Sequence, residues 1–252
     1  MIDNWDGFLW LLLLLGPLLI LQRSLHREIQ SVFLLLTRRA EMSFALFSLL
    51  FLPGVFLHEV SHFLVARLLG VRTGKFSLLP RALPNGKLQL GYVETAKTDI
   101  LRDSLIGAAP LVAGGLFVAY AGLNRMGLEA VLGAAQNLHI SEVWNALKVS
   151  TSNQDFWLWF YLSFAVSSTM LPSASDRRAW PSIAIALVIL LGLALVSGAG
   201  AWLATNLAPV FNEALRALDI VLGISVSFHL ILLPPFWVLR RFMEKLMRMQ
   251  VA

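Results

Sequence analysis

Residues 58–62 of the chain read HEVSH, which is the H-E-x-x-H pattern. Two histidines at i and i+4 of a helix lie on one face, one turn apart, so their ring nitrogens can reach a single Zn²⁺ ion at about 2.0–2.1 Å. Glu59, between them, projects beside the metal and can take a proton from water. Zinc lowers the pKa of bound water to about 7. The pattern therefore predicts a hydrolytic zinc site with His58 and His62 as ligands and Glu59 as the general base.

Such a site requires a third protein ligand, because two imidazoles do not complete a catalytic zinc centre. The chain contains no cysteine, so this ligand must be His, Asp or Glu. We expect Asp176 in this role, because Pro172 ends the apolar segment before it and turns the chain back toward the motif. The alternative role of Asp176 is to cap a following helix.

Other ionisable residues are weaker candidates for the site. His229 lies within a later apolar segment, where a hydrogen-bonded core histidine explains it more simply than a metal ligand does. We expect the acids of segment 94–103 to be solvated, and His26 and His139 to lie in loops without partners. For the motif itself, the alternative is a pair of hydrogen-bonded core histidines with a protonated Glu59.

The elements that position these residues are predicted to be membrane helices. Hydrophobic residues make up 58% of the 252 residues and charged residues 14%, whereas average soluble proteins are roughly half apolar and a quarter charged. This composition excludes a disordered chain, a coiled coil and a disulfide scaffold. The net charge of +5 fits basic cytoplasmic loops and not nucleic-acid binding, because no aromatic-basic motif accompanies it. We therefore expect an all-α polytopic protein of the lipid bilayer.

Six apolar segments approach the roughly 20 residues that a helix needs to cross a bilayer. They are Trp5–Leu21, Met42–Leu69, Leu101–Leu123, Phe156–Leu171, Ile183–Leu203 and Leu218–Leu239. The first is expected to be a retained helix and not a signal peptide, because acids precede it and no small-residue cleavage site follows. The motif lies inside the second, where each ionisable side chain costs on the order of 2–3 kcal/mol. We predict six spans in a single membrane domain, and packing alone does not explain the motif's place there.

The segments between the spans carry the charge. If the spans alternate in direction, about two thirds of the 20 Lys and Arg residues fall on one face, which is then cytoplasmic. Residues 22–41 form an exception, since they carry four arginines on the other face, and we expect them to lie along the interface as an amphipathic helix. Residues 125–155 are expected to form a polar loop facing outside.

A β-hairpin is predicted between the second and third spans. Residues 87–93 alternate in polarity, and residues 84–86, Pro-Asn-Gly, are a turn signal. A preceding strand around Lys75–Leu79 would pair with them. Strand edges cannot be left open in lipid, so the hairpin must lie at the interface or line a wet cavity. The alternative is a plain cytoplasmic hairpin without a role at the site.

Taken together, the residues resemble the site-2 proteases, the M50-type intramembrane zinc metalloproteases. The resemblance covers residues 42–182 and rests on three features in order along the chain. These are HEVSH in a membrane helix, Ala109-Pro110 in the next helix, and Pro172 followed by Asp176 after a later one. Outside it lie an extra N-terminal helix, C-terminal helices and a basic tail, at residues 5–21, 183–239 and 240–252.

The resemblance implies one Zn²⁺ per chain, held by His58, His62 and Asp176, with Glu59 as the general base. It also implies cleavage of transmembrane or membrane-anchored protein substrates, near the cytoplasmic side of a prokaryotic plasma membrane. The hairpin would pair with an unwound substrate segment. We expect that substrate segment to contact every second residue of the hairpin strand, which gives Leu88, Leu90 and Tyr92. The oligomeric state is left open.

The chain departs from the family pattern at several positions. Asp176 follows Pro172 by four residues where the family has five, and Arg177 stands in place of glycine. Thr169 and Ala113 occupy the places of two family asparagines, so the residue that stabilises the oxyanion is unassigned. Two alternatives therefore stay open. One is a catalytically inactive relative that binds transmembrane helices, and the other is a transporter that uses the intramembrane histidines.

Overall fold

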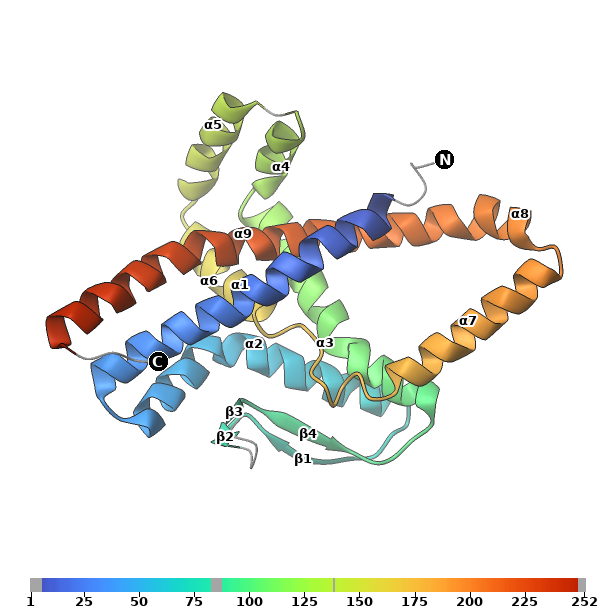
Figure 1. The fold of residues 1–252 in the computed structure, drawn as a ribbon, viewed down its shortest axis with the longest axis horizontal. Coiled ribbons are helices and arrows are strands. Elements are labelled where there is room, and N and C mark those ends of the chain that lie inside the picture. The colour runs from blue at the N-terminus through green and yellow to red at the C-terminus, as the bar shows by residue number, and fades with distance from the viewer. Residues whose placement is uncertain (1–5, 83–87, 138, 249–252) are drawn as a thin grey trace.

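The structure is a computed structural model that describes residues 6–82, 88–137 and 139–248. Most of these residues are helical, which confirms the all-α class (Figure 1). The helices are α1 (Asp6–Thr37), α2 (Ala40–Leu68), α3 (Ile100–Tyr120), α4 (Leu128–Gln136), α5 (Ile140–Thr151), α6 (Phe156–Ser167), α7 (Trp180–Val196), α8 (Gly200–Trp202) and α9 (Ala208–Met247). Two π-helical turns, Ala121–Arg125 and Leu203–Leu207, extend α3 and join α8 to α9.

Four helical stretches of the described residues are long and apolar enough to cross a membrane, which identifies a membrane protein. They are Asp6–Thr37, Ala40–Leu68, Ile100–Arg125 and Gly200–Met247. Helices α6 and α7 coincide with two further predicted spans but have only 12 and 17 residues. A 12-residue helix extends about 18 Å, against a hydrocarbon core of about 30 Å. The predicted count of six spans is therefore not confirmed.

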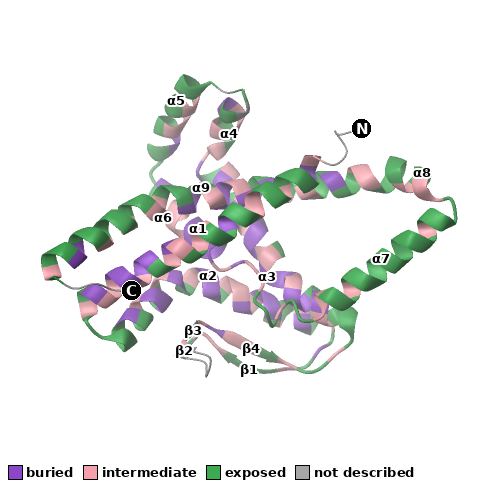
Figure 2. Ribbon diagram, viewed as in Figure 1, coloured by how far each residue is buried: buried purple, intermediate pink, exposed green. Residues whose placement is uncertain are grey.

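The core lies where α1, α2, α3, α6 and α9 meet, and the residues coloured as buried gather there (Figure 2). Phe51 of α2, Leu25 of α1 and Leu222 of α9 are among the most deeply buried. Helix α7, by contrast, has no buried residue although it is apolar throughout its length. Large apolar side chains remain exposed on its surface, such as Val188. Such an all-round apolar helix requires lipid as its solvent.

Helices α1 and α9 lie side by side and run in the same direction (Figure 1). Asp6 at the start of α1 pairs with Arg216, and Glu28 farther along α1 pairs with Arg240. Six spans that alternate in direction would make the first and last antiparallel, which these pairs contradict. The cytoplasmic assignment of the basic face depended on that alternation and stays a prediction.

Two segments between the predicted spans are more ordered than expected. Residues 22–37 continue α1 without a break and are not a separate interfacial helix. Their apolar side chains enter the core, including Leu25 and Ile29, and Pro17 is the only proline inside α1. Most of segment 125–155 forms the α4–α5 helical hairpin, which projects from the bundle (Figure 1). Both helices are amphipathic, which explains why this polar insertion is helical.

The strands lie between α2 and α3, as predicted. β1 (Thr73–Ser77) pairs antiparallel with β4 (Tyr92–Thr95), and β2 (Arg81–Ala82) pairs antiparallel with β3 (Leu88–Gln89). The predicted turn at 84–86 lies outside the described residues. The strands run alongside α2 (Figure 1), so the hairpin covers the helix that carries the motif.

Candidate metal centre

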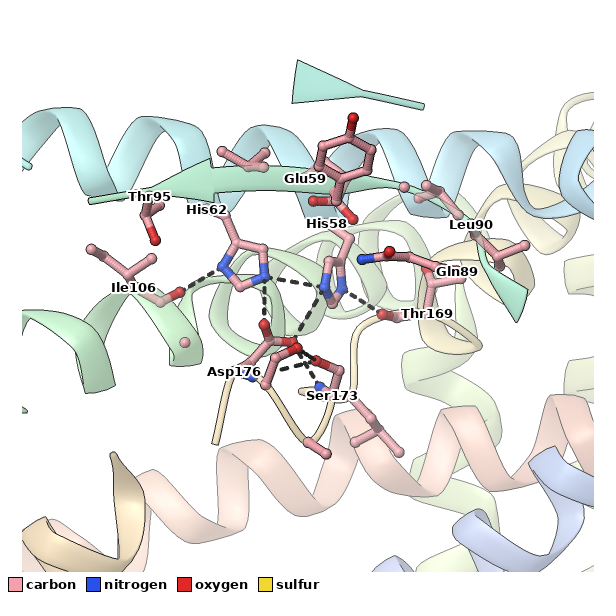
Figure 3. A pocket seen from close by; sticks show the side chains of 18 of the residues that line it. His58, Glu59, His62, Gln89, Leu90, Thr95, Ile106, Thr169, Ser173 and Asp176 are labelled. Atoms are coloured by element: carbon pink, nitrogen blue, oxygen red, sulfur yellow. Dashed lines mark hydrogen bonds and ion pairs between the residues drawn. The ribbon is translucent and has the colours of Figure 1, made fainter. Parts of the chain in front are cut away.

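Helix α2 places the two motif histidines one turn apart on the face that looks into the protein. Nε2 of His58 and Nε2 of His62 are 3.2 Å apart. Asp176, from the loop between α6 and α7, approaches both rings from the other side (Figure 3). Its Oδ2 is 3.7 Å from Nε2 of His58, and its Oδ1 is 3.4 Å from Nε2 of His62. The structure thus brings the three predicted ligands together.

The ring of His62 is held by a carbonyl group that a proline leaves free. Nδ1 of His62 donates a hydrogen bond of 2.8 Å to the backbone oxygen of Ile106 in α3. In a regular helix that oxygen would accept from the residue four positions later, which is Pro110 and has no N–H. Because a carbonyl oxygen only accepts, Nδ1 carries the proton and the Nε2 lone pair faces the site.

The ring of His58 is also oriented by a backbone carbonyl group, in this case at the end of α6. Its Nδ1 donates to the backbone oxygen of Thr169 over 2.7 Å. Helix α6 ends at Ser167, so the Thr169 carbonyl has no donor within that helix. Gly54 of α2 lets this helix end approach closely, since a Cβ atom there would overlap the carbonyl oxygen of Ala165 and the hydroxyl of Thr169. Both histidines therefore present Nε2 to the same point.

Asp176 is fixed by a reciprocal turn with Ser173. The backbone N–H of Ser173 donates to Oδ2 of Asp176 over 2.7 Å, and the N–H of Asp176 donates to the Ser173 hydroxyl over 3.3 Å, the pattern of a capping box. Burial alone would raise the pKa of Asp176, but the neighbouring imidazoles of His58 and His62 and the N–H of Ser173 outweigh it and hold this pKa well below its ordinary value. The carboxylate is therefore ionised, as a metal ligand must be.

The donor atoms have the spacing that a tetrahedral ion requires. Four ligands at 2.0–2.1 Å from an ion lie about 3.3 Å from one another, and the three distances here are 3.2, 3.4 and 3.7 Å. Among the described residues, His58, His62 and Asp176 are the group of His, Asp and Glu side chains that could hold a metal ion. Two imidazoles and one carboxylate suit zinc and leave one coordination position open.

Glu59 lies on the strand side of the histidines, opposite Asp176 (Figure 3). It is 7% exposed and lines a cavity of about 600 Å³ together with all three metal-site residues. Gly91 of the hairpin lies directly against it, because a Cβ atom there would be 2.9 Å from Cγ of Glu59 and 3.1 Å from Oε1. The hairpin thus forms one wall of the cavity above the predicted general base.

The predicted substrate-contacting residues are placed in part. Leu90 and Tyr92 line the cavity, whereas the side chain of Leu88 lies outside the described residues. Glu94 accepts a hydrogen bond from the backbone of Lys75 at the surface. Asp99 caps α3, and its bond with the N–H of Arg102 lowers the pKa of its exposed carboxyl group. Neither acid reaches the metal centre. The third acid of this segment, Asp103, is not solvated as predicted, because its side chain is 16% exposed, lines the cavity and pairs with Arg178.

The remaining histidines differ in outcome. His229 is completely buried and bonded at both nitrogens, as expected for a core histidine. The prediction for His26 is wrong, because it lies in α1 and packs against Phe47 and Phe51, not in a loop. The prediction failed because α1 continues without a break through position 26. His139 is at the surface but pairs with Glu142.

Sequence reasoning missed Gln89, whose carboxamide lies beside His58 and Thr169 in the cavity (Figure 3). A polar residue between Leu88 and Leu90 in an alternating strand was its only signal. Thr169 directs its hydroxyl to the carbonyl oxygens of Ala165 and Val166. The Thr169 side chain is therefore hydrogen-bonded to the end of α6.

The chain was compared with protein-family models, with curated proteins and with solved structures, and none of them matches.

Proposed function

We propose that the protein is an intramembrane zinc metalloprotease that hydrolyses peptide bonds of transmembrane or membrane-anchored proteins. One observation carries this proposal. Within the core of a membrane protein, His58, His62 and Asp176 present donor atoms at tetrahedral spacing, and Glu59 lies buried beside them at an open cavity. A structural metal site would have no need of a fourth position facing a cavity or of an unligated glutamate.

The proposed metal is zinc because its donor preferences match this set of side chains. When bound, zinc lowers the pKa of water and polarises a carbonyl group. Loss of Asp176 would leave only two protein donors, so the carboxylate completes the site as well as balancing part of the ion's charge.

The chain's own residues would carry the proton transfers. Glu59 accepts a proton from water as that water attacks the scissile carbonyl carbon, and then delivers it to the leaving amine. It is buried between α2 and the hairpin and lines the cavity, so water reaches this carboxylate through the cavity. The Gln89 carboxamide, on the His58 side of the cavity, has N–H donors for the oxygen of the scissile carbonyl.

The substrate class follows from the surroundings of the cavity. Helix α2 is a candidate span, so a peptide that reaches the cavity comes from the membrane or its interface. Leu90 and Tyr92 present apolar surface there, and the neighbouring strands can pair with an extended segment, which exposes its peptide bonds. These features support the site-2 protease type that the sequence resembles.

The test uses the full-length protein in lipid nanodiscs, loaded with zinc and mixed with a panel of single-pass transmembrane peptides. Wild type should cleave at least one of them. Glu59→Gln should keep stoichiometric zinc but lose cleavage by about 10²–10⁴-fold, the usual contribution of a general base. Glu129→Gln, at an exposed position of α4, is the matched control and should cleave like wild type.

Other results would contradict the proposal. If Glu59→Gln cleaves as fast as wild type, Glu59 is not the base. If zinc-loaded wild type binds the peptides but cleaves none, the alternative of an inactive helix-binding relative is favoured. The Thr169 hydroxyl agrees with that alternative, because it donates to the Ala165 carbonyl and is therefore not free to donate to a substrate. Zinc flux across liposomes without cleavage would instead favour a transporter.

A further inference from the structure

Three polar side chains from separate parts of the chain meet in the apolar core behind the metal centre. Nε2 of Gln22 in α1 donates to the backbone oxygen of Ser168 over 2.6 Å. The Ser168 hydroxyl lies 3.0 Å from Nε2 of His229 in α9, and Nδ1 of His229 lies 2.7 Å from the backbone oxygen of Ser225. Ser168 is 2% exposed and His229 0%. Polar side chains in membrane spans are costly and mark functional or structural demands.

The chemistry of the partners fixes the direction of these bonds. The Ser225 oxygen can only accept, so Nδ1 of His229 donates and its Nε2 accepts from the Ser168 hydroxyl. The Ser168 carbonyl would accept from residue 172 if α6 continued, but that residue is Pro172 and has no N–H. Gln22 supplies the missing donor. The carbonyl group of Ser168 therefore anchors it to α1, and its hydroxyl group anchors it to α9.

Ser168 is bonded directly to Thr169, whose backbone oxygen accepts the hydrogen bond from Nδ1 of His58. Helix α6 ends just before them, and the peptide group that carries this oxygen stays attached to α6 through the N–H of Met170, which donates to the Val166 carbonyl over 2.9 Å. The anchors on Ser168 add to this bond, and together they determine where the Thr169 oxygen lies. That oxygen in turn orients the His58 ring.

We propose that Gln22, Ser168 and His229 act as positioning residues for the metal centre, transmitting the packing of α1 and α9 to His58 through the Thr169 carbonyl. The proposal rests on the metal site of the proposed function, but it does not depend on proteolysis. It gives the N-terminal and C-terminal helices, which lie outside the part of the chain that resembles the protease family, a role in metal binding. It also explains why His229 is a histidine.

Two substitutions of His229 separate positioning from simple filling of the core. His229→Gln places an acceptor oxygen near the position of Nε2 and keeps the bond from Ser168. His229→Asn places its amide near the position of Nδ1, keeps the bond to Ser225 and loses the bond from Ser168. Ser168→Ala removes the same bond from the other side. Ser163→Ala is the matched control, because this hydroxyl is also fully buried near the end of α6 but has no partner among the described residues.

The measurements are zinc affinity of the metal-free full-length protein, by competition with a chromophoric chelator, and the absorption spectrum of bound Co²⁺. Loss of a partner that orients a metal ligand typically weakens metal affinity by 10–100-fold. We expect His229→Asn and Ser168→Ala to weaken zinc binding by about 10-fold and to alter the Co²⁺ spectrum. His229→Gln and Ser163→Ala should match wild type. The melting temperature of the metal-free protein reports any general loss of packing.

Wild-type zinc affinity and Co²⁺ spectra in both His229→Asn and Ser168→Ala would overturn the inference while leaving the metal site standing. Equal weakening in Ser163→Ala and His229→Gln, with a matching fall in melting temperature, would also overturn it, because packing alone would then explain the effect. If the wild-type protein binds no metal, the proposed function fails and this inference fails with it.

Discussion

The backbone carbonyl of Asp176 lies so close to Gly107 that a Cβ atom at position 107 would overlap its oxygen. Gly107 follows Ile106, whose own carbonyl oxygen accepts from Nδ1 of His62. One short stretch of α3 therefore supports two of the three proposed metal ligands. Arg178, two residues after Asp176, reinforces the contact through a bidentate pair with Asp103, at 2.6 and 2.8 Å.

Gly107→Ala should weaken zinc binding by 10-fold or more, because the loop that carries Asp176 must move away from the histidines to make room. Zinc affinity of the metal-free protein, by chelator competition, measures the effect. Gly192→Ala is the control, since nothing lies within 4 Å of a Cβ atom there, and it should bind like wild type. Equal affinities for both variants would show that the loop does not need this close approach.

Asp176→Ala should lose stoichiometric zinc, because only two protein donors remain and the water that replaces the carboxylate brings no charge. Metal analysis of the purified protein by mass spectrometry measures the zinc content. Asp155→Ala removes a carboxylate whose side chain is 61% exposed and that is not part of the metal centre, and it should retain one zinc per chain. Unchanged zinc in Asp176→Ala would exclude Asp176 as the third ligand.

Gln89→Ala should lower kcat by about 10²-fold, the usual effect of removing a donor that stabilises a developing oxyanion. KM and zinc content should stay close to those of wild type. Gln89→Glu should be at least as impaired, because a carboxylate accepts hydrogen bonds and repels the developing charge. Steady-state cleavage of a transmembrane peptide measures both constants, with the exposed hairpin variant Lys75→Ala as control. A kcat near that of wild type in Gln89→Ala would remove Gln89 from the proposed mechanism.

Glu28→Gln should destabilise the packing of α1 on α9 by about 1.5–3 kcal/mol, because Arg240 loses its charged partner on α1 and keeps only Glu244 of its own helix. Equilibrium unfolding in mixed micelles measures the free energy. Glu142→Gln disrupts the His139 pair, in which both side chains are 60% exposed, and should cost no more than about 1 kcal/mol. Similar free energies for the two variants would contradict a structural role for the buried pair.

Much of the candidate site was predictable from local patterns. The i, i+4 spacing of His58 and His62 fixes their common face once the segment is helical, and the length of the apolar segment around them predicts a helix. Pro172 predicts a chain reversal before Asp176, and alternation in residues 87–93 predicts strands. These are short-range constraints, and they operate within one or two turns of the chain.

The failures of prediction concern relations between distant elements. The arginines of segment 22–41 suggested an interfacial helix, because the sequence does not reveal that Glu28 finds Arg240 more than 200 residues away. The orientation rested on alternating span directions, whereas α1 and α9 run in parallel. The span count rested on the lengths of apolar segments, two of which form helices of only 12 and 17 residues. Gln89 and Ser168 carry no motif, so their places beside the histidines depend on how the hairpin and the end of α6 pack on α2.

The sequence by itself determined which groups can bind a cation and that they lie in apolar helices, because residue types, helical spacing and hydropathy are local properties. Only the tertiary structure decided which acid meets the histidines, which carbonyl groups orient their rings and which polar residues stand behind them. Those outcomes depend on close backbone contacts at Gly54 and Gly107 and on carbonyl groups left free near Pro110 and Pro172. Such contacts exist only after the helices have packed together.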